Sequence, residues 1–165
     1  MAKIEWDDSL SLGINELDGH HKELLRIINM FLDALNKNEN EDIISILITK
    51  LREYTIYHFN AEESFMEEIG YPLRLKHIQR HTELKRKVKA LQYSRFHHEN
   101  LTSDDYKKLL STWLFEHILD YDFKIVQYLK EQKNKPEDFR DKVKESWKKS
   151  KGNKSQDPEK PSVED

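Results

Sequence analysis

The chain has 165 residues, of which 36% are charged and 36% hydrophobic, and its formal net charge is −3 at pH 7. This length suggests one compact domain with a tail, and the interleaved acids and bases leave no basic surface for nucleic acid. The absence of cysteine excludes disulfides, iron–sulfur clusters and thiolate zinc sites. The N-terminus lacks the apolar core of a secretory signal and no apolar stretch reaches membrane length, so we expect a cytoplasmic protein.

The first part of the chain predicts an arm followed by a helix. Residues 1–17 contain scattered apolar side chains that form no helical stripe, and Asp18 with Gly19 is a plausible helix start. Apolar residues then recur every three or four positions until about residues 36–38, as expected for an amphipathic helix. An N-terminal arm is therefore expected to lead into the first helix.

Three more helices are predicted in order. The second begins near residues 40–42 and ends before Gly70, which suits the left-handed position after a helix. Pro72 suits the first turn of the third helix, which leads to a loop at about residues 94–101. A capping cluster at residues 102–105 begins the fourth helix. Four long helices joined by short loops predict an all-α, up-down-up-down antiparallel four-helix bundle.

The composition changes after the fourth helix. We assign residues 1–132 to the bundle domain and residues 133–165 to a charged, partly disordered C-terminal tail. Residues 136–147 could form a short amphipathic helix, because apolar side chains recur there every four positions. Residues 150–165 have the polar, charged composition of a disordered segment. The tail is not expected to reach the functional site.

Metal-ligand residue types lie inside the apolar stripes. His58 and Glu62 are four residues apart in the second helix, as are His77 and His81 in the third, so each pair shares one helix face. His21 lies on the stripe of the first helix. Burial of a carboxylate without a partner is costly, and no lysine or arginine lies on these stripes to neutralise Glu62. A bound cation would supply the missing charge.

The fourth helix leaves the identity of its second ligand open. Ordinary helical spacing from His117 favours Asp120 or Tyr121, whereas Asp122 lies five residues on, about 140° around the axis. Asp122 nevertheless follows Ile118, a member of the apolar stripe, by four residues and so borders the buried face. Asp120 lies nearer to solvent. The spacing therefore favours Asp122 by a small margin.

The donors indicate the metal. Imidazole and carboxylate without thiolate suit iron, zinc, manganese or copper. Seven donors are too many for one closed site and fit two metals with bridging carboxylates. A set dominated by imidazole suggests iron used for dioxygen binding, because enzymes that cleave dioxygen in similar bundles use more carboxylates.

Five neighbouring residues are interpreted as having no direct role. His20, His97 and His98 are expected to be solvated or to form local hydrogen bonds. Glu63 and Glu67 flank Glu62 but turn away from the stripe, so both are expected to be surface charges.

A set of motifs runs through residues 4 to 130, and together they are highly specific. In chain order they are Trp6, Gly13-Ile14, Leu17-Asp18, His21-Lys22, His58-Phe59, Glu62-Glu63, Met66, Gly70-Tyr71-Pro72, His77, His81, Trp113-Leu114, His117-Ile118 and Asp122. In these residues the chain resembles the hemerythrin family in its bacterial single-domain form.

The resemblance implies a site with two iron ions, an oxo or hydroxo bridge between them, and dioxygen as the ligand. Its protein ligands would be His77, His81 and His117 on one iron, His21 and His58 on the other, and Glu62 and Asp122 as bridges. The second iron would keep one coordination position open. The matching oxygen-pocket residues are Phe59, Trp113, Leu114 and Ile118.

The leading functional hypothesis is reversible dioxygen binding at this non-haem di-iron centre by a monomeric protein that is not an enzyme. Such a protein would store oxygen, deliver it to oxygen-consuming enzymes or sense it. One alternative is a di-iron enzyme of the peroxidase, nitric oxide reductase or iron-repair type. Another is an iron buffer without gas chemistry. No acid or base beyond the ligands lies on the stripes, which argues against an enzyme.

Overall fold

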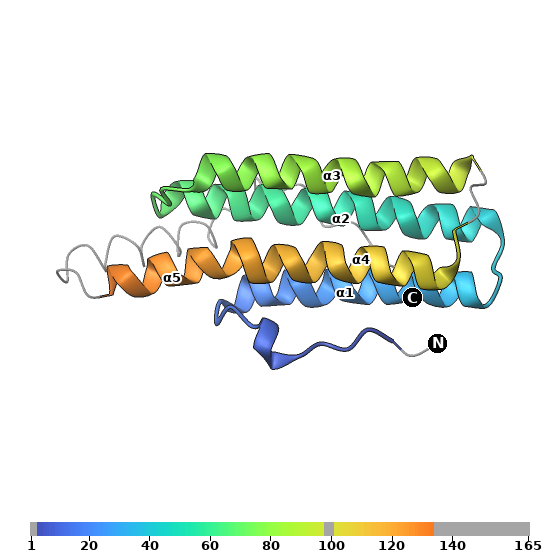
Figure 1. Cartoon of the computed structure of the whole chain (residues 1–165), viewed down its shortest axis with the longest axis horizontal. Coiled ribbons are helices and arrows are strands. Elements are labelled where there is room, and N and C mark those ends of the chain that lie inside the picture. The colour runs from blue at the N-terminus through green and yellow to red at the C-terminus, as the bar shows by residue number, and fades with distance from the viewer. Residues whose placement is uncertain (1–2, 98–100, 134–165) are drawn as a thin grey trace.

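The computed structural model describes residues 3–97 and 101–133, and this part of the chain is helical with no strand. Four long antiparallel helical segments form the bundle, as predicted (Figure 1). In chain order the elements are η1 (Asp8–Leu10), α1 (Asn15–Asn36), α2 (Glu41–Glu68), α3 (Arg74–Phe96), α4 (Ser103–His117), the π turn η2 (Ile118–Asp122) and α5 (Phe123–Gln132).

Several helix ends form where the sequence predicts them. The Asn40 side chain accepts a hydrogen bond from the Ile43 amide and so caps α2, and Gly70 follows α2 with a φ of 66°. Thr102 and Asp105 form a reciprocal capping box at the start of α4. These contacts satisfy backbone groups that the helix ends would otherwise leave unpaired.

Two predicted helix starts are wrong. Helix α1 begins at Asn15, before the predicted start at Asp18, because the Asp18 carboxylate bonds the N-terminal arm instead of capping a helix. Helix α3 begins at Arg74, so Pro72 lies in the preceding turn rather than in the first turn of the helix. The Arg74 amide donates to the Tyr71 carbonyl across that turn.

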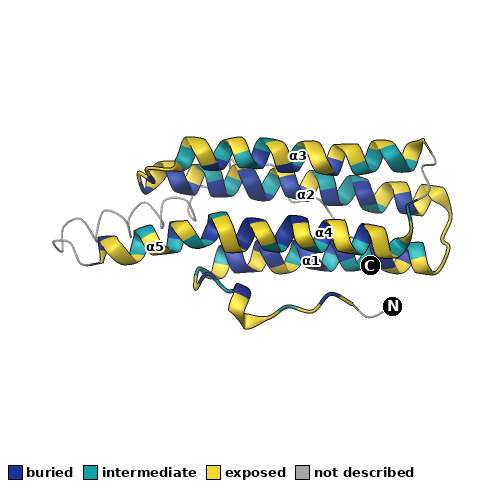
Figure 2. Cartoon of the chain, in the orientation of Figure 1, coloured by how far each residue is buried: buried dark blue, intermediate teal, exposed yellow. Residues whose placement is uncertain are grey.

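The apolar core continues on both sides of a polar layer. Buried residues form inward-facing stripes along all four long segments (Figure 2). On α2, buried Leu51 precedes buried His58, and buried Met66 follows buried Glu62. The polar side chains of this layer are therefore enclosed by apolar packing above and below, which removes them from water.

The N-terminal arm is attached to α1 at two places, and a buried carboxylate makes one of them. Asp18 is 8% exposed, and its two oxygens accept hydrogen bonds from the Ser11 hydroxyl at 2.6 Å and the Leu12 amide at 2.8 Å. Farther along, the Asn29 side-chain amide exchanges two hydrogen bonds with the backbone of Ile4. The arm therefore follows the surface of α1 (Figure 1), and its Leu12 is buried.

The predicted tail helix at residues 136–147 and the predicted disorder at residues 150–165 lie outside the described residues, which end at Lys133. Within the described ranges, no helix combines the length and the apolar character that a membrane crossing requires.

Replacement of Asp18 tests the attachment of the arm. Asp18→Ala should lower the free energy of unfolding by about 2–3 kcal/mol, because it leaves a buried amide and a hydroxyl without their charged acceptor. Urea denaturation would measure this loss, and limited proteolysis should cut the variant within the arm. Asp18→Asn, which keeps one acceptor oxygen, should lose less. Wild-type stability in Asp18→Ala would contradict the attachment.

Candidate metal centre

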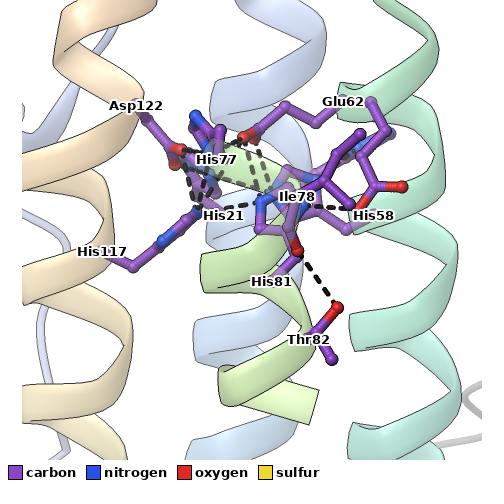
Figure 3. Close-up of polar contacts among 11 residues, drawn as sticks. His21, His58, Glu62, His77, Ile78, His81, Thr82, His117 and Asp122 are labelled. Carbon is purple, nitrogen blue, oxygen red and sulfur yellow. Dashed lines mark hydrogen bonds and ion pairs between the residues drawn. The ribbon is translucent and has the colours of Figure 1, made fainter. Parts of the chain in front are cut away.

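The seven predicted ligand side chains meet in the polar layer of the bundle. His21 comes from α1, the pair His58 and Glu62 from α2, and the pair His77 and His81 from α3. His117 is the last residue of α4 and Asp122 the last of η2. All seven are at most 3% exposed, and Figure 3 shows them converging on one region.

The π turn explains the unusual spacing in the fourth segment. The sequence predicts one continuous helix there, in which residues five apart point in different directions. The structure instead widens the turn over Ile118–Asp122, and this brings Oδ1 of Asp122 to 3.0 Å from Nε2 of His117. Asp122 is fully buried and Asp120 is exposed, so the fourth segment contributes Asp122 to the cluster. π turns of this kind occur often at functional sites.

The donors form two groups that share both carboxylates. One group contains three histidines and the other contains two, and within each group the donor atoms lie within 4.8 Å of one another. The groups are His77, His81 and His117 with Glu62 and Asp122, and His21 and His58 with the same two acids. We call them the three-histidine group and the two-histidine group.

Each carboxylate directs one oxygen to each group. Oε1 of Glu62 lies 2.8 Å from Nε2 of His77, and Oε2 of Glu62 lies 3.2 Å from Nε2 of His58. Asp122 is arranged in the same way, with Oδ1 at 3.1 Å from Nε2 of His77 and Oδ2 at 3.1 Å from Nε2 of His21. A carboxylate in this position can bridge two cations.

The donor side chains of the two groups are arranged better for binding cations than for forming hydrogen bonds with one another. Despite these short distances, none of the four oxygens of Glu62 and Asp122 has a hydrogen-bond partner of acceptable geometry among the described residues. Only histidines lie within ion-pair distance of the two acids in this part of the chain. Converging imidazole nitrogens and unpaired carboxylate oxygens are the donor set of a non-thiolate metal site.

The buried charges shift the pKa values of this cluster. Burial would raise the pKa of Glu62, but the four surrounding imidazoles hold it well below its ordinary value. Burial would lower the pKa of His77, but Asp122 and Glu62 outweigh it and raise this pKa to about 9. Burial lowers the pKa of His58. Without metal, His77 is therefore protonated at neutral pH.

Two side chains outside the predicted set contact the Nδ1 atoms of two predicted ligand histidines. Nδ1 of His20 lies 3.0 Å from Nδ1 of His58, and Oε1 of Glu63 lies 2.8 Å from Nδ1 of His81. The interpretation of His20 as solvated or locally bonded was therefore wrong, since its partner is on another helix. The interpretation of Glu63 as a surface charge was also wrong.

Of the other three neighbouring residues, two agree with their predictions and one lies outside the described residues. His97 is exposed and its Nδ1 lies 3.0 Å from the Tyr93 carbonyl on its own helix, as expected. Glu67 is an exposed charge whose nearest partner is Arg74 at 3.5 Å, also as expected. His98 lies outside the described residues.

An apolar pocket adjoins the cluster. Its apolar side chains include three of the four predicted pocket residues, while Ile118 is buried but does not line it. The complete lining is His21, Leu24, His58, Phe59, Leu84, Trp113, Leu114 and His117. Sequence reasoning missed Leu24 and Leu84, although both lie on the apolar stripes of their helices. The pocket is too narrow here to hold a sphere of the size of a water molecule.

Comparisons with known proteins agree with this geometry. Residues 12–129 match the Hemerythrin family, described as the hemerythrin HHE cation binding domain. A bacteriohemerythrin of Pseudomonas paraeruginosa (strain DSM 24068 / PA7) is 37% identical over 122 residues, which are 74% of this chain and 78% of the relative. A bacteriohemerythrin of Clostridium acetobutylicum is 33% identical over 125 residues, covering 71% of this chain and 94% of the relative.

A solved crystal structure of a mutant protein, in which a leucine is replaced by phenylalanine, matches with a TM-score of 0.66. It is 24% identical, and the match covers 74% of this chain and 94% of that chain. At this identity the likeness shows the helical fold alone.

The shifted pKa of His77 predicts how the stability of metal-free protein depends on pH. The folded pKa of about 9 exceeds the ordinary value of 6.5, so protonated His77 stabilises the fold fully below pH 6.5. This contribution, on the order of 3 kcal/mol, should disappear as the pH rises through about 9. Urea denaturation of metal-free protein between pH 6.5 and 10 would measure the decrease.

Two controls separate this effect from general alkaline unfolding. Metal-free His77→Gln should lose the share of the pH dependence that His77 contributes and show a smaller decrease, while His117, whose pKa burial would lower but Asp122 and Glu62 raise, keeps its own share. Metal-loaded wild-type protein should be more stable than metal-free protein at each pH and should not show the decrease, because a metal-bound imidazole is neutral. A decrease of equal size in metal-free His77→Gln would overturn the assignment to His77.

Proposed function

The chain belongs to the hemerythrin family, and on this premise we propose that it binds dioxygen reversibly at a non-haem di-iron centre. We further propose that the three-histidine group binds one iron, the two-histidine group binds the other, and Glu62 with Asp122 bridges them. In this role the protein stores oxygen, delivers it to oxygen-consuming enzymes or senses it.

The observation that carries the proposal is the position of the apolar pocket. With the shared carboxylates, one group offers five donor residues and the other offers four. Both histidines of the smaller group, His21 and His58, line the pocket, whereas the larger group contributes only His117. An ion with fewer protein ligands would keep a position for a small apolar molecule such as dioxygen, and the narrow apolar pocket beside it would have to widen by movement of its side chains to admit that molecule.

The pocket side chains would act by excluding water and protons. Leu24, Phe59, Leu84 and Leu114 offer no polar side-chain atom, and the Trp113 indole N–H already donates to the Leu84 carbonyl at 3.1 Å. The bound ferrous pair would supply the electrons with which dioxygen is held. A dry surrounding slows side reactions that would release reduced oxygen and leave ferric iron.

The same lining argues against the enzyme alternative. Its polar side chains are histidines of the two donor groups, and no further acid or base lines it within the described residues. A peroxidase or nitric oxide reductase would gain from a group that could deliver protons to the ligand. Action in the cytoplasm and as a monomer stays a prediction.

An optical experiment tests reversible binding. Iron-loaded protein, reduced with dithionite and freed of the reductant without air, should develop a visible absorption band in air. Purging with argon should remove the band and fresh air should restore it, because the oxygen adduct is in equilibrium with free dioxygen. Iron analysis of the same sample should give two irons per chain.

Other outcomes would favour the alternatives. A band that decays once to a ferric spectrum and never returns would overturn reversible binding, and turnover with peroxide or nitric oxide would then support an enzyme. Iron uptake without any oxygen-dependent band would support a buffer.

Leu114 gives a test of the pocket itself. Leu114→Ala should accelerate the spontaneous conversion of the oxygen adduct to ferric protein several-fold, because the cavity admits water. Truncation in a core also costs about 2–5 kcal/mol of stability, so circular dichroism must show that the variant is folded. Leu109→Ala is the matched control, since Leu109 is on the same helix but 47% exposed. Equal conversion rates in the two folded variants would argue against this role of the pocket.

A further inference from the structure

The five ligand-type histidines differ at the ring nitrogen that faces away from the cluster. Nδ1 of His58 and Nδ1 of His81 each have a partner, whereas Nδ1 of His21, His77 and His117 has no hydrogen-bond partner among the described residues. One partnered histidine belongs to the two-histidine group and the other to the three-histidine group. Each group therefore has one histidine whose outward-facing Nδ1 has a hydrogen-bond partner.

His20 is well placed to hold His58. It is 8% exposed, and its ring packs against the rings of Tyr54 and Tyr57, with centroid distances of 6.1 Å and 5.3 Å. If Nε2 of His58 binds a cation, the ring proton must be on Nδ1, which then donates to Nδ1 of His20. The neutral His20 ring thus selects the tautomer and the ring orientation that binding requires.

The Glu63 carboxylate is the hydrogen-bond partner of His81. The Glu63 side chain is 19% exposed, and Oε1 accepts from Nδ1 of His81 at 2.8 Å. The Phe59 ring stacks on the His81 ring at a centroid distance of 3.9 Å and an interplanar angle of 4°. A carboxylate behind an imidazole strengthens the imidazole as a metal donor more than a neutral partner does.

We propose that His20 and Glu63 are positioning residues, each acting on a different metal ion of the pair. His20 stabilises the ion of the two-histidine group through His58, and Glu63 stabilises the ion of the three-histidine group through His81. Because it has the charged partner and one more histidine, the three-histidine group holds its ion more firmly than the two-histidine group does. This inference rests on the proposed two-metal site and adds to it an order in which the ions leave.

Cobalt(II) release from the full chain tests the proposal without any oxygen chemistry. Metal-free protein is loaded with Co²⁺, the metal content is measured, and an excess of chelator is added while the visible cobalt spectrum is followed. Wild-type protein should bind two ions per chain and release them in a fast and a slow phase, the fast phase coming from the two-histidine group.

Paired variants separate positioning from simple loosening of the fold. His20→Leu removes the acceptor and should accelerate only the fast phase, by about 10- to 100-fold. His20→Gln, whose amide oxygen can accept from His58, should recover most of the loss. Glu63→Leu should accelerate only the slow phase by a similar factor, and Glu63→Gln should fall between Glu63→Leu and wild type. His97→Leu and Glu67→Gln change exposed residues of the same types and should change neither phase.

A second readout addresses the hydrogen bonds directly. In the proton NMR spectrum of the Co²⁺-loaded wild-type protein, the exchangeable N–H signals of the bound histidines are shifted out of the main envelope by the paramagnetic ion. His20→Leu should make one of these protons exchange faster with water, and Glu63→Leu should do so for a different one.

The outcomes distinguish this inference from the proposed function. If the protein binds two ions per chain but each Leu variant accelerates both phases equally, or changes neither phase, the positioning roles are wrong and the two-metal site stands. Binding of a single ion per chain would overturn both. Acceleration of the fast phase alone by His20→Leu and of the slow phase alone by Glu63→Leu, with recovery in His20→Gln, would establish the inference, whereas the reverse assignment of phases would overturn it.

Discussion

The structure depends on two carboxylates that are fully buried without a lysine or arginine partner in the described part of the chain. Glu62 and Asp122 lie in a layer enclosed by apolar packing, and the groups within ion-pair distance of them are histidines. Burial of such charges is expensive unless opposite charge compensates it. Protons on the histidines can supply this compensation in the metal-free protein, and bound cations would supply it otherwise. The fold and the metal chemistry are therefore coupled at the same two residues.

The bundle meets this requirement with ordinary helix geometry at three of the four segments. His58 and Glu62 share a face of α2 because they are four residues apart, and His77 and His81 do so on α3. The fourth segment needs a local departure, the π turn that ends at Asp122. The widened turn lets one segment direct both His117 and Asp122 at the cluster. Such turns are less stable than regular helix, so the turn is consistent with a functional requirement at this position.

The two groups are unlike in ways that follow from their surroundings. The two-histidine group adjoins the apolar pocket, and its histidine His58 has the imidazole of His20 as partner. The three-histidine group lies mostly away from the pocket, and its histidine His81 has a charged partner in Glu63. In the proposed site, one side would accept the ligand and the other would remain intact. The proposed dioxygen binding and the proposed order of metal release both follow from this difference.

The sequence by itself determined the all-α bundle, because its apolar residues repeat at helical spacing and its capping residues stand at the expected ends. It also determined that His58 with Glu62, and His77 with His81, occupy the buried stripes, since side chains four apart share a face. The tertiary structure alone decided the π turn, the partners of His20 and Glu63, and the role of Asp18 in attaching the arm. The partners of His20 and Glu63 are distant along the chain, the π turn is a local break in helix periodicity, and the Asp18 contacts depend on how the irregular arm folds back on the helix. A helical stripe predicts the direction of a side chain, but the neighbouring helix decides what that side chain meets.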